Sequence, residues 1–157
     1  MADRKKIIAV IGQGSECTPE IDSLAEEVGF EIASRGAVLI CGGLYGVMES
    51  ACRGAKKAGG LTIGILPSSD KSDANPYVDL PIATGMSEAR NVIIVRTADA
   101  VIAVGGFYGT LSEIAYALAF DKPMVGLRTW DIDAKIRRAD SADAAVKQSF
   151  ELIAGGR

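Results

Sequence analysis

Short, uninterrupted runs of branched apolar residues recur along the chain and constrain its fold more than any other feature. Such runs are typical of parallel strands that are buried on both faces of a sheet. They occupy residues 7–11, 37–40, 61–66, 101–104 and 124–127. The segments between them carry apolar residues at helical spacing. Strands that alternate with helices predict an α/β fold with a doubly wound, mostly parallel, Rossmann-like sheet.

Several local signals place the remaining elements. Thr18 and Pro19 are typical of an N-cap and a first helical turn, and Gly36 is typical of the end of the same helix. Further elements are expected as a strand at 80–83, a helix at 87–97 and a closing helix at 139–153. Residues 67–81 are polar and lack periodicity, which predicts a mobile surface connection, with a lid as the alternative.

The chain length and charge limit the classes of protein to consider. A chain of 157 residues buries one core but is too short for two ordinary domains, so we expect one domain over residues 1–157. The net charge of −3 leaves no surplus of cations for a nucleic acid partner. The apolar run near the N-terminus is short and enters a glycine turn. We therefore expect no signal peptide, no membrane contact and a cytoplasmic location.

Histidine is absent from the sequence, and this narrows the possible chemistry. Its absence excludes Ser-His-Asp and Cys-His nucleophile systems and histidine zinc sites. Cys17, Cys41 and Cys52 form no C-x-x-C pair, and we expect them to be reduced and to pack as small buried apolar residues. We predict no metal site, and any acid-base step falls to carboxylates.

One glycine pattern occurs twice, each time between a predicted strand and a predicted helix. Each copy reads Gly-Gly, an apolar residue, Tyr and Gly. Glycines at such a junction let backbone N–H groups approach a ligand, and the following helix adds free amides, so each loop is suited to phosphate. The structural alternative is that the glycines merely permit tight turns. The repetition of the pattern on one sheet edge disfavours this alternative. The predicted binding residues are Gly42, Gly43, Tyr45 and Gly46 in the first loop, and Gly105, Gly106, Phe107, Tyr108, Gly109 and Thr110 in the second.

A third glycine turn follows the first predicted strand. Gly12, Gly14 and Ser15 are expected to form a further rim of the same site. Cys17 stands where a dinucleotide fingerprint needs its third glycine, so nicotinamide chemistry is not supported. The sequence also lacks the G-x-x-x-x-G-K-S/T pattern, which excludes ATP hydrolysis of the P-loop kind.

Arg90 and Glu113 are the charged candidates for this site. Arg90 lies near the start of its predicted helix, where a cation opposes the helix dipole unless an anion is close. A solvated surface arginine paired with Glu88 is an equally supported interpretation. Thr110 and Glu113 match a capping box, which gives Glu113 a structural role. A carboxylate at this position could also bind a ribose hydroxyl or polarise water.

Aromatic side chains accompany both glycine loops. Tyr45, Phe107 and Tyr108 could stack on a planar base or pterin. Loop aromatics more often pack against the rim of the sheet, so stacking is the less favoured interpretation.

Three ordered motifs at residues 41–49, 84–90 and 98–113, followed by Lys122 and Pro123, resemble those of a known family. They are similar to the LOG family, once described as lysine decarboxylases, and more closely to its small branch of molybdenum cofactor carrier proteins. The resemblance implies a nucleotide-binding domain that assembles into homodimers or homotetramers. LOG enzymes hydrolyse AMP or cytokinin nucleoside monophosphates to a free base and ribose 5-phosphate. By this resemblance Arg90 and Glu113 match their catalytic residues, and residues 105–110 would hold the phosphate.

The sequence departs from the LOG enzymes at three positions. Gly105 replaces the proline of their P-G-G-x-G-T-x-x-E motif, Phe107 replaces its second glycine, and Asn91 replaces a lysine after the arginine. We therefore expect a carrier of a phosphorylated heterocycle, either the molybdenum cofactor or an AMP-like nucleotide, with no cofactor required for catalysis. A phosphoribohydrolase is the alternative, and a regulatory subunit with a vestigial pocket ranks third.

Two further expectations concern chemistry and assembly. Lysine decarboxylation is excluded, because no lysine stands at a strand end in a recognisable pyridoxal arrangement. Residues 92–95 are apolar in succession, which is more apolar surface than one sheet face needs. We expect part of this segment to lie in an interface between copies of the chain.

Overall fold

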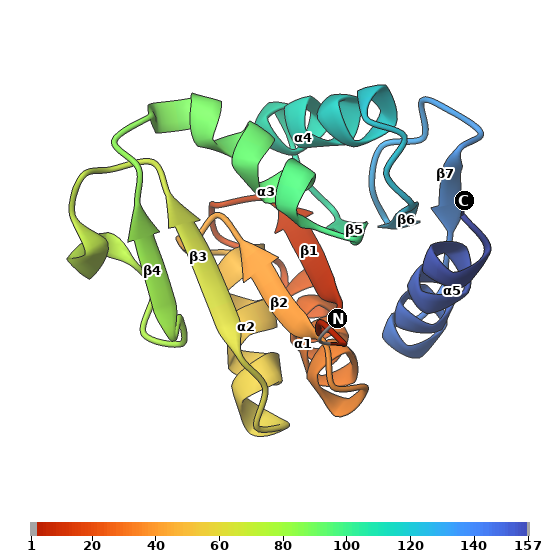
Figure 1. Cartoon of the computed structure of the whole chain (residues 1–157), viewed down its shortest axis with the longest axis horizontal. Coiled ribbons are helices and arrows are strands. Elements are labelled where there is room, and N and C mark those ends of the chain that lie inside the picture. The colour runs from red at the N-terminus through yellow and green to blue at the C-terminus, as the bar shows by residue number, and fades with distance from the viewer. Residues whose placement is uncertain (1–2, 157) are drawn as a thin grey trace.

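A computed structural model of the protein describes residues 3–156. Its strands are β1 (Ile7–Gly12), β2 (Val38–Cys41), β3 (Thr62–Leu66), β4 (Leu80–Ala83), β5 (Ala100–Val104), β6 (Met124–Leu127) and β7 (Ile136–Arg138). They form one parallel sheet in the order β4-β3-β2-β1-β5-β6-β7 (Figure 1). The predicted α/β, Rossmann-like sheet is confirmed, and every strand expected from the sequence is present.

Strand β7 was not predicted from the sequence. It has three residues and pairs with β6 at the edge of the sheet. Only Ile136 of this strand is buried, while Arg137 and Arg138 are exposed. A short, charged edge strand is a common way to prevent pairing with another sheet, and it lacks the apolar run that marks the other strands.

Helices cover both faces of the sheet. One face carries α1 (Pro19–Ser34), α2 (Val47–Lys57) and α5 (Ala142–Gly155), and the other carries α3 (Asn91–Thr97) and α4 (Tyr108–Ala119) (Figure 1). The helix expected at 87–97 begins as a 3₁₀ turn, η2 (Ser87–Arg90), before α3. The last helix starts later than expected, because Ser141 is its N-cap. None of the helices in the described residues is long and apolar enough to cross a membrane.

Strand β1 shows why the apolar runs are continuous. Ile8 and Val10 pack under α1, α2 and α5, whereas Ala9 and Ile11 pack under α3 and α4. Each of these residues is at most 1% exposed. Because successive side chains of a strand point to opposite faces, a strand covered on both sides must be apolar throughout. Burial of each large side chain stabilises the fold by roughly 1.5–3 kcal/mol.

Helices α1 and α2 pack against each other with their backbones in close contact. A Cβ atom added to Gly29 would lie 1.8 Å from the carbonyl oxygen of Ala51, and one added to Gly54 would lie 1.8 Å from that of Glu26. Any side chain at either glycine would therefore force the two helices apart. This contact fixes the helix that follows the first glycine loop.

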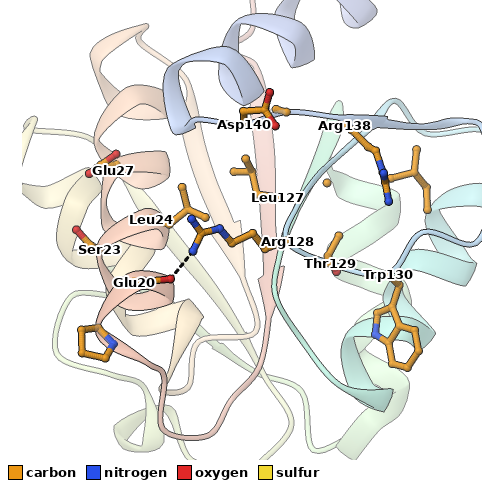
Figure 2. A pocket seen from close by; sticks show the side chains of 14 residues that line it. Glu20, Ser23, Leu24, Glu27, Leu127, Arg128, Thr129, Trp130, Arg138 and Asp140 are labelled. Atoms are coloured by element: carbon orange, nitrogen blue, oxygen red, sulfur yellow. Dashed lines mark hydrogen bonds and ion pairs between the residues drawn. The ribbon is translucent and has the colours of Figure 1, made fainter.

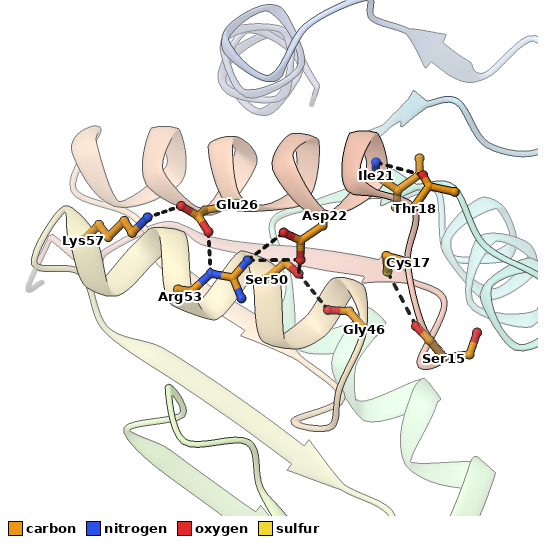
Figure 3. Close-up of polar contacts among 10 residues, drawn as sticks. All are labelled: Ser15, Cys17, Thr18, Ile21, Asp22, Glu26, Gly46, Ser50, Arg53 and Lys57. Carbon is orange, nitrogen blue, oxygen red and sulfur yellow. Dashed lines mark hydrogen bonds and ion pairs between the residues drawn. The ribbon is translucent and has the colours of Figure 1, made fainter.

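A polar network along the same pair of helices adds to this contact (Figure 3). The Arg53 guanidinium pairs with the Asp22 and Glu26 carboxylates, and Lys57 also pairs with Glu26. Ser50 donates a hydrogen bond to Asp22. The Ser50 hydrogen bond, aided by Arg53, lowers the pKa of Asp22. The network therefore stabilises the charged forms of the side chains that join α2 to α1.

The three cysteines are free thiols. Cys41 and Cys52 are buried, as predicted, and their sulfur atoms lie 3.6 Å apart, within hydrogen-bond distance and not joined by a disulfide. Cys17 is only half-buried, so the expectation of a fully buried residue fails there. Its position before the α1 N-cap, in an open turn, explains its exposure.

The order of strands places one crevice at the centre of the sheet. The chain runs outward from β1 through β2 and β3 to β4, and then crosses to β5 on the other side of β1. Helices therefore leave the carboxyl ends of β1 and β5 toward opposite faces. In open α/β sheets, ligands bind at such a point.

Substitution of Gly54 tests the close packing of α1 and α2. We expect Gly54→Ala to lower the free energy of unfolding by at least about 1–3 kcal/mol, because the added methyl group meets backbone atoms that cannot yield. Gly155→Ala is the control, since its Cβ would meet nothing within 4 Å. Urea unfolding followed by circular dichroism measures both variants. Equal stability of the two would contradict this packing.

Candidate functional site

A cleft of about 230 Å³ lies at the carboxyl ends of β1 and β5. It unites segments that are far apart in the sequence: the turn after β1, the first glycine loop, the η2–α3 junction and the start of α4. Seven of its lining residues were predicted from the sequence. The lining residues are Gly12, Gln13, Gly14, Leu44, Met48, Glu88, Arg90, Asn91, Phe107, Gly109, Thr110 and Glu113.

The N-terminus of α4 is open to a ligand. Among the described residues, the backbone amides of Tyr108, Gly109 and Thr110 have no protein acceptor, and the first helical bond joins the Leu111 amide to the Phe107 carbonyl at 2.9 Å. Free amides at a helix N-terminus, together with the helix dipole, favour an anion. The second glycine loop therefore offers free backbone amides, and its binding of phosphate stays a prediction.

The first glycine loop has a different environment. The Val47 amide at the start of α2 donates to the Gln13 carbonyl at 3.0 Å, and the Gly43 amide donates to the Cys41 sulfur at 3.3 Å. A Cβ atom on Gly46 would lie 2.2 Å from the Gln13 carbonyl oxygen. The turn after β1 thus covers the start of α2, so the two loops are alike in sequence but not in accessibility.

Asn75 anchors the polar 67–81 segment to this first loop. Its side chain donates to the Leu44 carbonyl at 2.6 Å, and its backbone amide donates to the Gly43 carbonyl at 2.9 Å. Asn75 is only 2% exposed. The segment also contains a 3₁₀ turn, η1 (Lys71–Asp73). The alternative that it acts as a lid stays a prediction.

Arg90 is buried at the floor of the cleft. Only 6% of the residue is exposed, so the interpretation as a solvated surface arginine is wrong. Its Nε atom donates to the Ile65 carbonyl at 3.0 Å, and its Nη1 atom donates to the Asn91 side-chain oxygen at 2.6 Å. The exposed Glu88 carboxylate lies 3.5 Å from Nη1. A Cβ on Gly42 would lie 3.0 Å from Nη2, so this glycine makes room for the guanidinium.

Glu113 does not cap its helix. The N-cap of α4 is Phe107, so Thr110 and Glu113 both lie inside the helix and the predicted capping box is wrong. Glu113 is 8% exposed, and its carboxyl group has no hydrogen-bond partner in the described part of the chain. Burial raises the pKa of Glu113 to about 8, with Arg90 opposing and Glu88 adding to the rise. At neutral pH the side chain is a neutral acid that can donate a hydrogen bond into the cleft.

The loop aromatics differ in their contacts. Tyr45, Phe107 and Tyr108 are all more than half exposed, but only Phe107 lines the cleft. Tyr108 lies beside Trp130, with the ring centres 6.1 Å apart. Trp130 in turn donates from its indole nitrogen to the Phe107 carbonyl at 3.1 Å. Phe107 is therefore the aromatic residue placed to meet a planar ligand, whereas Tyr108 has a neighbour within the protein.

Sequence reasoning missed some residues of the cleft and included others outside its lining. Asn91 was predicted only as a departure from a family motif, and Gln13 lies within the third glycine turn but was not among the predicted residues. The missed lining residues are Gln13, Leu44, Met48, Glu88 and Asn91. The predicted residues that do not line it are Ser15, Gly42, Gly43, Tyr45, Gly46, Gly105, Gly106 and Tyr108.

A larger cavity of about 880 Å³ lies between α1 and the segment that follows β6 (Figure 2). Arg128 reaches across it to the Glu20 carboxylate at 2.7 Å, and both side chains are exposed. None of the residues predicted to bind a ligand lines this cavity. The smaller cleft is the better candidate site, because it combines free helix amides with a buried cation and a buried acid whose pKa is shifted.

Comparison with known proteins agrees with this fold. A family model described as the SLOG cluster4 family matches residues 5–153. The chain belongs to this family. The molybdenum cofactor binding protein of Rippkaea orientalis is similar to this SLOG cluster4 chain at 42% identity and a TM-score of 0.87, over 98% of both chains. The molybdenum cofactor carrier protein of Chlamydomonas reinhardtii is 37% identical, with a TM-score of 0.87, over 96% of this chain and 99% of that one.

An enzyme is also among the relatives. The cytokinin riboside 5'-monophosphate phosphoribohydrolase of Mycobacterium tuberculosis is 33% identical over 132 residues, which is 78% of this chain and 71% of the enzyme. The resemblance to the LOG family inferred from three motifs is therefore confirmed. The relatives include both carriers and a hydrolase.

The free energy of unfolding of the protein should depend on pH because Glu113 is a buried acid. An unfolded chain releases the Glu113 proton near pH 4.5, whereas the folded protein releases it near pH 8. The stability from the neutral acid is therefore complete below about pH 4.5 and is lost as the pH rises toward 8. The glutamine of Glu113→Gln cannot ionise. The free energy of unfolding of this variant should therefore rise relative to that of wild type by up to about 1.4 kcal/mol per pH unit in this window.

Urea unfolding at a series of pH values measures this difference, with Glu49→Gln as the control. Glu49 occupies the matching place after the first glycine loop and does not line the cleft. A difference in the free energy of unfolding between wild type and Glu113→Gln that stays constant across this pH window would contradict the buried neutral acid.

Proposed function

We propose that this SLOG cluster4 protein binds and carries a phosphorylated heterocycle, and that its ligand is the molybdenum cofactor, a phosphorylated pterin. The observation that supports this most is the open N-terminus of α4 directly beside Arg90 and Glu113. The likeness to a molybdenum cofactor binding protein and to a carrier protein, each over nearly the whole chain, supports the choice of ligand.

The chain's own groups divide the work of binding as follows. The amides of Tyr108, Gly109 and Thr110 receive the phosphate, and Arg90 supplies the positive charge opposite them. Neutral Glu113 donates a hydrogen bond to a phosphate or ring oxygen. Since Arg90 is already held at Nε and Nη1 by the protein, it meets the ligand without losing further side-chain entropy.

The heterocycle lies at the mouth of the cleft. A volume of about 230 Å³ is below the usual range for a whole ligand of this size, so the cleft holds mainly the phosphate end. Leu44, Met48 and Phe107 provide the apolar part of the lining. The metal in this ligand is bound by the pterin's own dithiolene, so binding needs no protein metal ligands.

The first glycine loop supports the site without holding the phosphate. The Gly43 amide and the Val47 amide that follows the loop are used within the protein, and Gly42 leaves the space that the Arg90 guanidinium fills. We therefore assign the phosphate to the second loop alone, which refines the expectation that both loops bind it.

A phosphoribohydrolase is the second candidate, and one observation favours it. Glu113 is a buried acid with a pKa of about 8, which suits a general acid that protonates a departing base. Arg90 beside it would steady the negative charge of the phosphate during cleavage. The hydrolase relative from Mycobacterium tuberculosis agrees with this alternative.

We further propose that the protein assembles with copies of itself. Val92 and Ile93 on α3 remain half-buried, and Leu80 and Ile82 on β4 are 50% and 48% exposed. The strand register places Leu80 and Ile82 beside Ile63 and Ile65, on the α3 face of the sheet. Sedimentation equilibrium of the purified protein tests this, and a monomer at every concentration would contradict it.

Removal of Arg90 should weaken binding of the cofactor. We expect Arg90→Ala to lose about tenfold to a hundredfold in affinity, because a charge-assisted hydrogen bond inside a cleft contributes about 1.5–3 kcal/mol. The measurement is the amount of molybdenum that co-elutes with the protein in gel filtration at rising concentrations of cofactor. Arg128→Ala, in the larger cavity, is the control and should bind as wild type does. Equal binding by Arg90→Ala would refute the assignment.

Incubation with AMP separates the carrier from the hydrolase. We expect chromatography to recover intact AMP after incubation with wild type. Free base that appears with wild type and disappears in both Arg90→Ala and Glu113→Ala would establish the hydrolase instead. Failure to bind either the cofactor or AMP would favour a regulatory subunit with a vestigial pocket.

A further inference from the structure

Gln13 contacts both glycine loops, although it was not among the residues predicted to bind a ligand. Its backbone carbonyl accepts the Val47 amide at 3.0 Å, which closes the start of α2. Its side-chain oxygen accepts the Gly106 amide at 3.3 Å, in the second loop. Its side-chain nitrogen donates to the Glu16 carbonyl at 3.2 Å. One residue of the turn after β1 therefore joins the two loops.

The contact with Gly106 differs from the rest of the second loop. Within residues 3–156, the amides of Tyr108, Gly109 and Thr110 lack a protein acceptor, whereas the Gly106 amide, just before them, is bound by Gln13. The bond is long for an N–H to oxygen contact, since most such bonds are about 2.9–3.0 Å. A carbonyl oxygen is also a weaker acceptor than an ionised phosphate oxygen. The Gln13 oxygen therefore lies where a stronger acceptor could replace it.

The geometry around Gly105 and Gly106 allows little else to occupy this place. A Cβ on Gly105 would lie 3.1 Å from the Gln13 side-chain oxygen, and one on Gly106 would lie 2.4 Å from the Thr110 hydroxyl. Both residues have positive φ angles, of 56° and 107°. The loop is therefore shaped closely around the Gln13 amide on one side and Thr110 on the other.

We propose that Gln13 is a displaceable acceptor that sets the affinity of the site for phosphate: a ligand phosphate oxygen takes the Gly106 amide, and the Gln13 side chain withdraws from it. This inference rests on the proposed function, because it places the phosphate at the start of α4. Binding is then a competition between the ligand and Gln13 for one N–H group. Since Gln13 belongs to the turn after β1, the displacement also transmits the presence of phosphate to that turn.

Three substitutions at Gln13 distinguish this role from others. Gln13→Ala removes the competing oxygen, and Gln13→Asn is too short to keep the contact, so both should bind inorganic phosphate about threefold to tenfold more tightly. Gln13→Glu keeps the shape but adds a charge that competes with and repels phosphate, so it should bind at least about tenfold more weakly. The backbone contact with Val47 does not depend on the side chain. Gln148→Ala on α5 is the control, because Gln148 does not line the cleft.

Two-dimensional ¹⁵N NMR titration with inorganic phosphate measures the dissociation constant from the Gly109 amide. The Gln13 side-chain resonance, identified by its loss in Gln13→Ala, should shift at the same phosphate concentrations. If Gln13→Ala binds phosphate as tightly as wild type or more weakly, Gln13 is not a competitor and the inference is wrong. If phosphate moves no α4 amide in wild type or in any variant, the proposed function fails, and this inference fails with it.

Discussion

The hydrogen bond between the Val47 amide and the Gln13 carbonyl distinguishes two loops of similar sequence. It places the turn after β1 over the start of α2, where the absence of a side chain at Gly46 permits the close approach. The N-terminus of α4 has no such cover, although its loop has nearly the same sequence. Accessibility of backbone amides therefore distinguishes the two loops more than the glycine pattern itself does.

Burial gives the two charged candidates their properties. Arg90 keeps two of its nitrogen atoms bonded within the protein, so its charge is fixed in position at the floor of the cleft. Glu113 has no such partners, and burial keeps it protonated at neutral pH. The fixed cation attracts an anion, and the neutral acid beside it does not repel that anion. The same pair also suits an acid catalyst.

Much of the fold could be predicted because β1, β2, β3, β5 and β6 are marked by local patterns that two-sided burial imposes. Strand β7 lacked such a pattern, since two of its three residues are exposed arginines. The prediction of a capping box was wrong because α4 begins at Tyr108, so its N-cap is Phe107. Thr110 comes three residues after that cap and is a buried residue inside the helix. Gln13 contacts the second glycine loop, which is distant in the sequence. Asn91 contacts the Arg90 guanidinium, whose position cannot be predicted from sequence spacing. Their roles depend on tertiary packing, which the sequence pattern does not encode.

The most direct test of this account is a crystal structure of the protein grown with inorganic phosphate. The account predicts phosphate on the amides of Tyr108 to Thr110, within hydrogen-bond distance of Arg90, with the Gln13 side chain withdrawn from Gly106. Phosphate bound at the start of α2, or beside Arg128 in the larger cavity, with none at α4, would contradict it.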